Sequence, residues 1–287
     1  MYVIAGVSGN TGSIVASQLL AAKKPVRVIV RDAAKGEAWR ARGAEVAVAD
    51  LEDQAALTRA LTGATAAYLL LPPTAWSQGG IAADRARKTA AIAGALRAAR
   101  PGHLVLLSSI AAELPSGTGP IRFLHTLENA VRDLGIPTTF LRAGAFIENW
   151  AAQLPAAVAG GALYHALEAT TVFPQVAVED IGKTAARLLL EGPPASSPRI
   201  VELAGPADAS LGDIVAAASR AAGKPIQAVT VPAAAMIDAL VGQGASRELA
   251  EDYAEMAVGL NAGTIKFHGT PLRGQVTIDQ RVKTFVA

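Results

Sequence analysis

The sequence Gly6-Val7-Ser8-Gly9-Asn10-Thr11-Gly12 decides the fold, because it follows a short apolar run at residues 2–5 and opens a helical stretch at residues 13–22. Glycines here permit a tight turn, let the backbone approach a diphosphate and allow the helix to pack closely on the strand. The helix start adds unpaired N–H groups and the positive end of its dipole. The segment predicts a nucleotide-binding turn; the alternative is a plain glycine-rich turn between strand and helix. The expected binding residues are Gly6, Ser8, Gly9, Asn10, Thr11 and Gly12.

Short apolar runs alternate with alanine-rich helical stretches through the first half of the chain. We expect strands at residues 2–5, 26–30, 45–48, 66–71, 103–107 and 138–141, and helices at residues 13–22, 53–61, 81–99 and 121–134. The strands are apolar on both faces, which is typical of a parallel sheet covered by helices on both sides. This pattern predicts an α/β fold, a Rossmann-type doubly wound parallel sheet.

The alternation loosens after residue 142, where further helices are expected at residues 179–190, 211–222, 233–241 and 247–259, with strands at 199–203 and 225–231. We therefore predict a dinucleotide-binding domain over residues 1–150, completed by about residues 176–205. Residues 151–175 and 206–287 are expected to form a smaller, mainly helical substrate-binding part that roofs the crevice at the strand ends.

Composition excludes several classes of protein. The chain has no cysteine, a net charge of +2 and 17% charged residues, so a disulfide scaffold, a thiolate metal site, a nucleic-acid-binding surface and a disordered chain are not expected. Its long uncharged stretches contain prolines and glycines, which argues against a membrane span. No signal peptide is visible at the start. We expect a soluble cytoplasmic protein without nucleic-acid or membrane contacts.

The end of the second predicted strand bears on cofactor choice. Arg31 and Asp32 follow that strand, about 20 residues beyond the glycine-rich turn. Residues at this position of the fold bind the adenosine ribose of the cofactor. Arg31 can clamp a 2′-phosphate, whereas Asp32 can hold a free 2′-hydroxyl. Because Arg31 comes first, NADP is favoured over NAD; the alternative is a solvated pair at a helix start. Asp50 and Leu51 are expected to border the adenine, although Asp50 also suits a helix N-cap.

These features resemble the NmrA-like group of atypical short-chain dehydrogenases. The resemblance rests on the glycine spacing, Arg31, Asp50-Leu51, Leu71-Pro72-Pro73, Glu128, the segment 141–146 with Asn149, and the segment 178–182. It implies an NADP(H) cofactor, to which Leu71, Pro72, Gly144 and Phe146 would contribute. Ser108 is added because it ends the fifth predicted strand, at the sheet edge where a nicotinamide would lie. The family includes NADPH-dependent quinone reductases, enone and ether reductases, and redox sensors that bind NADP without turnover.

The usual catalytic pair of short-chain dehydrogenases is missing. That pair is Tyr-x-x-x-Lys, but the residues four positions after the four tyrosines are Gly6, Pro72, Glu168 and Ala257. No lysine occurs between Lys88 and Lys183. The ordinary carbonyl reductase mechanism is therefore excluded, and a sugar-nucleotide epimerase or dehydratase is disfavoured.

Ser108, Ser109, His125 and Glu128 remain near the expected reaction centre. His125 is the candidate proton donor, because an imidazole titrates near neutral pH; the alternative is a polar residue at a helix start. Glu128 is expected to orient other groups rather than to transfer protons. The other histidines show no metal-ligand spacing, so no metal site is expected.

A reaction without a strong side-chain acid suits an electrophilic acceptor. Flat aromatic acceptors suit an apolar crevice, for which the candidate lining residues are Trp76, Phe146, Trp150, Tyr164 and Phe173, with ordinary core packing as the alternative for each. We expect an NADPH-dependent oxidoreductase that transfers hydride to a quinone, an enone or another electrophilic small molecule. The alternative is a non-catalytic NADP(H) sensor that acts through a regulatory protein partner. A homodimer also remains open.

Overall fold

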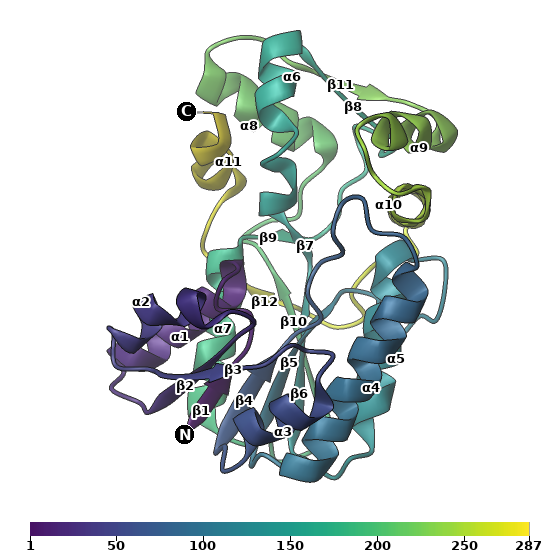
Figure 1. The fold of residues 1–287 in the computed structure, drawn as a ribbon. Helices are drawn as coiled ribbons and strands as arrows, with labels where there is room; N and C mark the ends of the chain where they lie inside the picture. The colour runs from purple at the N-terminus through teal and green to yellow at the C-terminus, as the bar shows by residue number, and fades with distance from the viewer. Residues whose placement is uncertain (287) are drawn as a thin grey trace.

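The computed structural model describes residues 1–286, and its centre is one eight-stranded parallel sheet in the order β12-β10-β6-β5-β4-β1-β2-β3 (Figure 1). From β1 the chain adds β2 and β3 toward one edge of the sheet and then β4, β5 and β6 toward the other edge, so the direction reverses between β1 and β4. Such a reversal opens a crevice at the carboxyl ends of the strands. The strands of this sheet are β1 (Tyr2–Ile4), β2 (Val26–Val30), β3 (Glu45–Val48), β4 (Ala66–Leu69), β5 (Leu104–Ser109), β6 (Thr138–Ala143), β10 (Arg199–Ala204) and β12 (Leu272–Arg273). The predicted doubly wound fold is confirmed.

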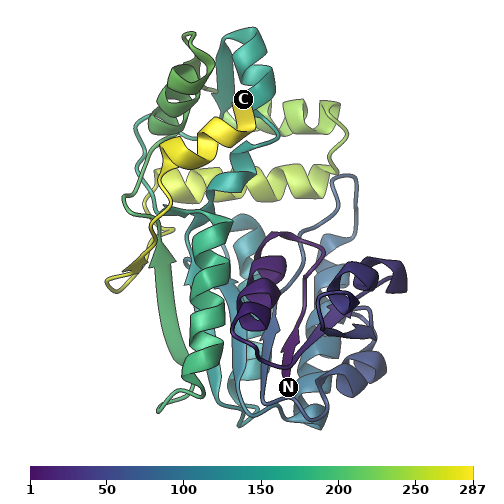
Figure 2. The ribbon, with the colours of Figure 1, turned by 90° about the vertical axis from the view of Figure 1, so that its left-hand side faces the viewer.

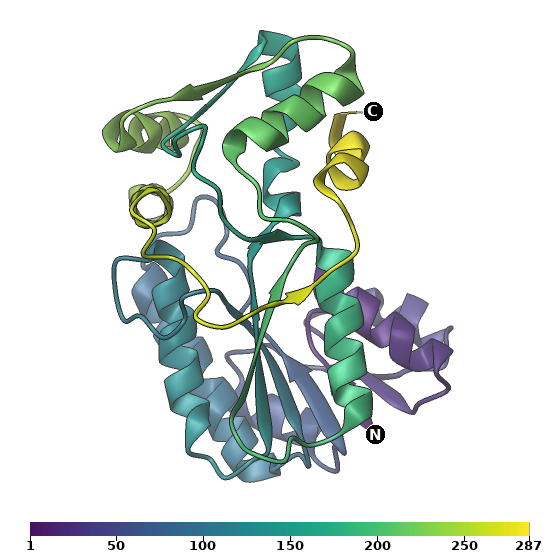
Figure 3. The ribbon, with the colours of Figure 1, turned by 180° about the vertical axis from the view of Figure 1, so that it is seen from behind.

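Helices cover both faces of the sheet, as Figures 1 and 3 show. One face carries α1 (Asn10–Ala21) and α7 (Val178–Glu191), which pack against each other. The opposite face carries α3 (Gln54–Leu61), α4 (Ile81–Ala99) and α5 (Arg122–Arg132). The short segments η1 (Ala33–Gly36) and α2 (Glu37–Arg40) link β2 to β3.

Successive strand residues explain this two-sided core. Val3 packs into the cluster under α3, α4 and α5, whereas the next residue, Ile4, packs into the cluster under α1 and α7. Side chains alternate between the faces of a strand, so a run of apolar residues is needed when both faces are covered. Each apolar strand therefore holds two helix layers at once and fixes where its carboxyl end lies.

A second group of elements, taken mostly from the second half of the chain, lies beyond the carboxyl ends of the strands (Figures 1 and 2). Its elements are η2 (Gly119–Ile121), β7 (Ala145–Phe146), η3 (Ile147–Trp150), α6 (Leu154–Gly160), β8 (Ala162–His165), β9 (Gln175–Val176), α8 (Leu211–Ala222), β11 (Gln227–Thr230), α9 (Ala233–Gly242), α10 (Arg247–Asn261) and α11 (Ile278–Val286). β8 pairs in parallel with β11, and α11 packs against α8. The predicted division into two parts stays a prediction, and its last residue, 287, lies outside the described residues.

Several of these elements were not expected from the sequence pattern. β12 has two residues, and α6 has seven with a proline at its start, so neither presents a long periodic pattern. α11 is amphipathic but buries a single side chain completely, that of Val282. Over residues 1–286, no helix has the length and apolar character that crossing a bilayer demands.

Candidate functional site

The glycine-rich turn joins β1 to α1 and leaves the start of that helix open. Gly6 has a φ of +71°, and a Cβ there would lie 2.7 Å from Leu70 Cδ2. The Gly9 N–H donates to the Gly6 carbonyl at 3.0 Å. Gly9 is the N-cap residue of α1, and no side chain caps that helix within the described residues. The first-turn N–H groups are therefore free to bind an anion such as a phosphate.

Gly12 and Thr11 fix the position of the turn relative to β1 and β4. A Cβ on Gly12 would lie only 2.3 Å from the Ala5 carbonyl oxygen, so only glycine allows α1 to lie this close to β1. The buried Tyr68 hydroxyl donates to Thr11 Oγ1 at 2.8 Å. Burial, only partly offset by that hydrogen bond, raises the pKa of Tyr68 well above its ordinary value. This phenol therefore stays protonated and anchors the start of α1.

One large cavity, of about 640 Å³, runs along the carboxyl ends of the strands from the glycine turn to α10. Most of the sequence-predicted residues line it, namely Gly6, Ser8, Gly9, Asn10, Thr11, Arg31, Asp50, Leu51, Leu71, Pro72, Ser108, Gly144, Phe146 and Phe173. A single wall thus contains residues from all six expected strand ends. Gly12 does not line the cavity, because this residue of α1 faces the backbone at the end of β1.

The end of the cavity at β2 and β3 carries the charged residues. Arg31 is exposed in this wall and forms no ion pair with another of residues 1–286. Asp32 lies outside the wall, and its Oδ1 accepts from the Ala34 N–H at 3.0 Å as the cap of η1. Asp50 Oδ1 accepts from the Glu52 N–H at 3.0 Å. Arg31 is therefore the available group for an anionic substituent here.

A buried polar network stands behind the middle of the cavity. Ser108 and Arg142 are neighbours across β5 and β6, and both bind the carboxylate of Glu128 on α5. Ser108 Oγ donates to Glu128 Oε1 at 2.6 Å, and Arg142 Nη2 lies 2.7 Å from Glu128 Oε2. Burial lowers the pKa of Arg142, but the hydrogen bond and charge of Glu128 outweigh it and raise that pKa overall. With its proton committed to Glu128, Ser108 offers an accepting lone pair to the cavity.

The structure does not bring His125 into the cavity wall. Its Nδ1 lies 3.0 Å from the Ala112 carbonyl oxygen, and its Nε2 lies 2.9 Å from Nδ2 of Asn129. These partners fit one neutral tautomer, in which Nδ1 donates to the carbonyl and Nε2 accepts from the amide. Both ring nitrogens are therefore engaged, and this conformation leaves neither for a ligand.

Three of the five predicted substrate-lining aromatics also lie elsewhere. Trp150 is 6% exposed in the core, where its Nε1 donates to Gln175 Oε1 at 2.9 Å. Trp76 is 43% exposed and donates to the Gln243 carbonyl, whereas Tyr164 is 64% exposed. None of the three borders the cavity, so their expected placement is corrected. Phe146 and Phe173 do border it.

The sequence pattern missed the residues of α10 that border the cavity. Tyr253, Met256 and Leu260 are three and four positions apart, so they share one face of the helix. That spacing was visible in the sequence, but it did not show that α10 packs against η2 and turns this face toward the cavity. Ile121, Leu124 and Ile265 complete this apolar part of the wall.

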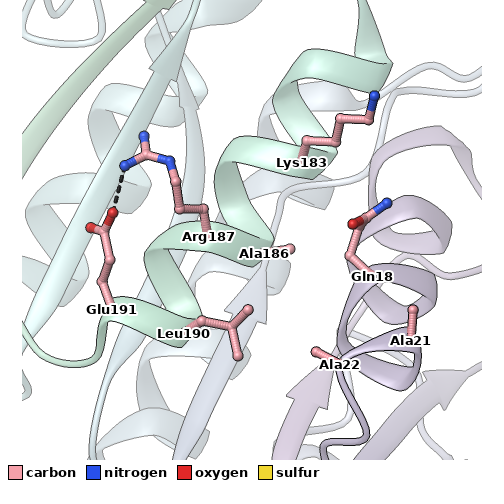
Figure 4. A pocket seen from close by; sticks show the side chains of 8 residues that line it. All are labelled: Gln18, Ala21, Ala22, Lys183, Ala186, Arg187, Leu190 and Glu191. Carbon is pink, nitrogen blue, oxygen red and sulfur yellow. Dashed lines mark hydrogen bonds and ion pairs between the residues drawn. The ribbon is translucent and has the colours of Figure 1, made fainter.

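A second, shallow hollow of about 500 Å³ lies between the ends of α1 and α7 (Figure 4). Gln18, Lys183 and Leu190 are among its lining residues, and Arg187 pairs with Glu191 beside it. Both helices end near the amino ends of the strands, away from the glycine turn. It holds none of the residues that the sequence motifs single out. Within residues 1–286, no cluster of three or more histidine, aspartate and glutamate side chains is arranged to hold a metal ion.

Comparison with known proteins agrees with this architecture. The family model described as the NmrA-like family matches residues 2–265. The chain is 28% identical to the NAD(P)H azoreductase of Xenophilus azovorans over 256 residues, which covers 89% of this chain and 86% of that protein. It is 33% identical to a (4-alkanoyl-5-oxo-2,5-dihydrofuran-3-yl)methyl phosphate reductase of Streptomyces griseus over 236 residues, covering 79% and 76% of the two chains.

A solved structure shares the whole fold. The NADPH-dependent quinone oxidoreductase of Escherichia coli, determined as its NADPH complex, superposes with a TM-score of 0.85 at 28% identity and covers 99% of both chains. The family match spans most of this chain and includes β1, the glycine turn and α10. The chain therefore belongs to the NmrA-like family.

Proposed function

We propose that this protein is an NADPH-dependent oxidoreductase that reduces a quinone or another electrophilic small molecule in the cavity at the carboxyl ends of the strands. One observation carries the proposal: a single cavity joins the open start of α1 to an apolar region under α10. A ligand that spans it meets anion-binding groups at one end and apolar side chains at the other.

The residues present fit this cofactor. The turn at Gly6 and Gly9, with the uncapped start of α1, would hold the diphosphate, because both glycines border the cavity and no side chain occupies the helix start. Arg31 would pair with the 2′-phosphate, and Asp50 and Leu51 would border the adenine. NAD, which lacks that phosphate, would leave Arg31 unused and is less favoured.

The remaining lining residues would orient the reacting rings and exclude water. Ser108 and Gly144 lie at the ends of β5 and β6, and Phe146 and Phe173 lie beside them. When bound, NADPH would supply a hydride. Ser108 would accept a hydrogen bond from a ligand on this side of the cavity, because its hydroxyl group already donates to Glu128. The relatives named as an azoreductase and a quinone oxidoreductase support an acceptor that is electrophilic and flat.

Steady-state NADPH oxidation tests the proposal. The purified protein would be given NADPH with menadione, an aliphatic enone and an azo dye in turn, and the loss of the reduced nicotinamide absorbance would be followed. We expect turnover with at least one acceptor and formation of the reduced product in equal amount. Tight NADPH binding without oxidation by any of them would contradict the proposal and favour the redox sensor, whose partner affinity should differ between NADP⁺ and NADPH.

A further inference from the structure

The part of the cavity under α10 contains few polar groups. The charged residues of the wall, such as Arg31 and Lys88, belong to the other end, near β2, β3 and α4. Around Phe146 and Phe173, the lining residues of the described chain include no charged side chain, and the polar side chains there are those of Ser108, Ser109, Asn149 and Tyr253. A polar atom of a ligand in this region therefore has few partners to choose from.

Tyr253 is held firmly in that wall. Its ring packs against Ile81, Phe123 and Leu249, and it also contacts the core of the second half of the chain. Rigid packing on both sides limits the positions that its hydroxyl group can reach.

The hydroxyl group of Tyr253 has no hydrogen-bond partner among residues 1–286, in contrast to the Tyr68 hydroxyl, which donates to Thr11. The buried polar atoms that lack a partner do not include this hydroxyl group, so it is accessible to solvent. The open space that Tyr253 borders is the cavity. Burial raises the pKa of this phenol, although the nearby positive charge of Arg85 opposes the rise. The group therefore stays protonated at neutral pH and is free to donate.

We propose that Tyr253 donates a hydrogen bond to the acceptor oxygen of an uncharged carbonyl substrate, such as a quinone, bound under α10. This inference rests on the proposed function. As hydride reaches the substrate, negative charge develops on the carbonyl oxygen, and a fixed donor stabilises that charge. The phenol keeps its proton, and water supplies the proton of the final hydroxyl group.

The same wall bears on substrate class. A phosphorylated acceptor needs a cationic partner, which the described residues around Phe146 and Phe173 do not provide. The acceptor is therefore expected to be neutral, unlike the phosphate ester named for the Streptomyces griseus relative.

The test uses the protein saturated with NADP⁺, which cannot deliver hydride, so menadione can be titrated as an unreacted ligand. Tyr253→Phe should weaken menadione binding by about 3- to 10-fold, the size of one hydrogen bond. The infrared carbonyl stretch of bound menadione should lie at lower frequency in the unaltered protein than in the variant. With NADPH, Tyr253→Phe should lower kcat/KM for menadione by about 10²-fold, with NADPH affinity unchanged.

Tyr164→Phe is the matched control, because it removes the same hydroxyl group from a tyrosine that is 64% exposed and does not border the cavity. It should keep the carbonyl frequency and most of the rate. Equal menadione affinity and equal carbonyl frequency in the unaltered protein and Tyr253→Phe would overturn the assignment while leaving the reductase proposal standing. If the unaltered protein oxidises no NADPH, the reductase proposal fails, and the NADP⁺ titration and infrared spectrum still decide whether Tyr253 binds a carbonyl.

Discussion

Ser108 and Arg142 lie side by side on neighbouring strands, and the carboxylate of Glu128 joins them into one buried unit. Arg142 is 4% exposed and Glu128 1% exposed, so neither charge is screened by water. A buried pair of this kind contributes little net stability as a pair, but removing Glu128 takes two contacts from Arg142 and leaves it with the less buried Glu113.

Glu128→Ala should therefore destabilise the fold by about 3–5 kcal/mol, measured by urea unfolding. Lys183→Ala is the control, because it breaks an ion pair of similar length, 2.6 Å, that is exposed. That change should cost less than about 1 kcal/mol. Equal losses in the two variants would show that the ion pair with Glu113 compensates the charge of Arg142 when Glu128 is absent.

Arg31→Ala should weaken NADPH binding by roughly 10- to 150-fold, equivalent to about 1.5–3 kcal/mol for one charge-assisted contact. NADH binding should change little, because NADH lacks the 2′-phosphate. Arg42→Ala is the control, since Arg42 stacks on Trp39 outside the cavity. Fluorescence titration with both cofactors gives the two affinities. Equal losses of affinity for NADPH and NADH would show that Arg31 does not bind the 2′-phosphate.

Gly9 and Gly12 should respond differently to added side chains. A Cβ on Gly9 meets only the Gly6 carbonyl oxygen, at 3.4 Å, so Gly9→Val should keep the fold and place its methyl groups in the space expected for the diphosphate. Gly12→Ala should instead lower the melting temperature, because its Cβ meets the Ala5 carbonyl at 2.3 Å. Circular dichroism and NADPH titration separate the two effects. Retained NADPH affinity in Gly9→Val would place the cofactor elsewhere.

The sequence predicted the sheet and the cofactor end of the cavity because both depend on local patterns. Gly6 and Gly9 lie in one turn, and Arg31 directly follows a strand, so chain position alone brings them to the same edge. The aromatic residues carry no such information, because the same ring suits a cavity wall or a core. Trp150 fills the core, whereas Tyr253 reaches the cavity only because α10 folds back against η2.

Acid should destabilise the protein through two histidines, the buried His103 and the half-buried His165. Burial lowers the pKa of His103 to about 4, helped by the charge of Arg199, and burial alone lowers that of His165 to about 4. Their ordinary pKa is 6.5, so the unfolded chain binds more protons between these values. The stabilising effect is present above pH 6.5 and is lost as pH falls through about 4.

Urea midpoints between about pH 7 and pH 4.5 measure this loss. A double variant, His103→Leu with His165→Asn, should show a flatter decline than the unaltered protein. His268→Gln, which replaces an imidazole whose side chain is 63% exposed, should keep the original slope. An unchanged slope in the double variant would assign the acid sensitivity to other groups.

His125 gives the sharpest contrast between sequence pattern and geometry. As the proton donor it would contribute about 10²-fold or more to kcat. Yet it lies outside the cavity wall, and its nitrogens are engaged by the Ala112 carbonyl and the Asn129 side chain. We therefore expect His125→Gln to leave kcat within about threefold of the unaltered protein, far below a general acid's contribution. The variant should leave the pH profile of turnover unchanged as well. A large fall in kcat with unchanged NADPH affinity, together with loss of a pH-dependent limb near the imidazole pKa, would mean that His125 turns into the cavity when substrate binds.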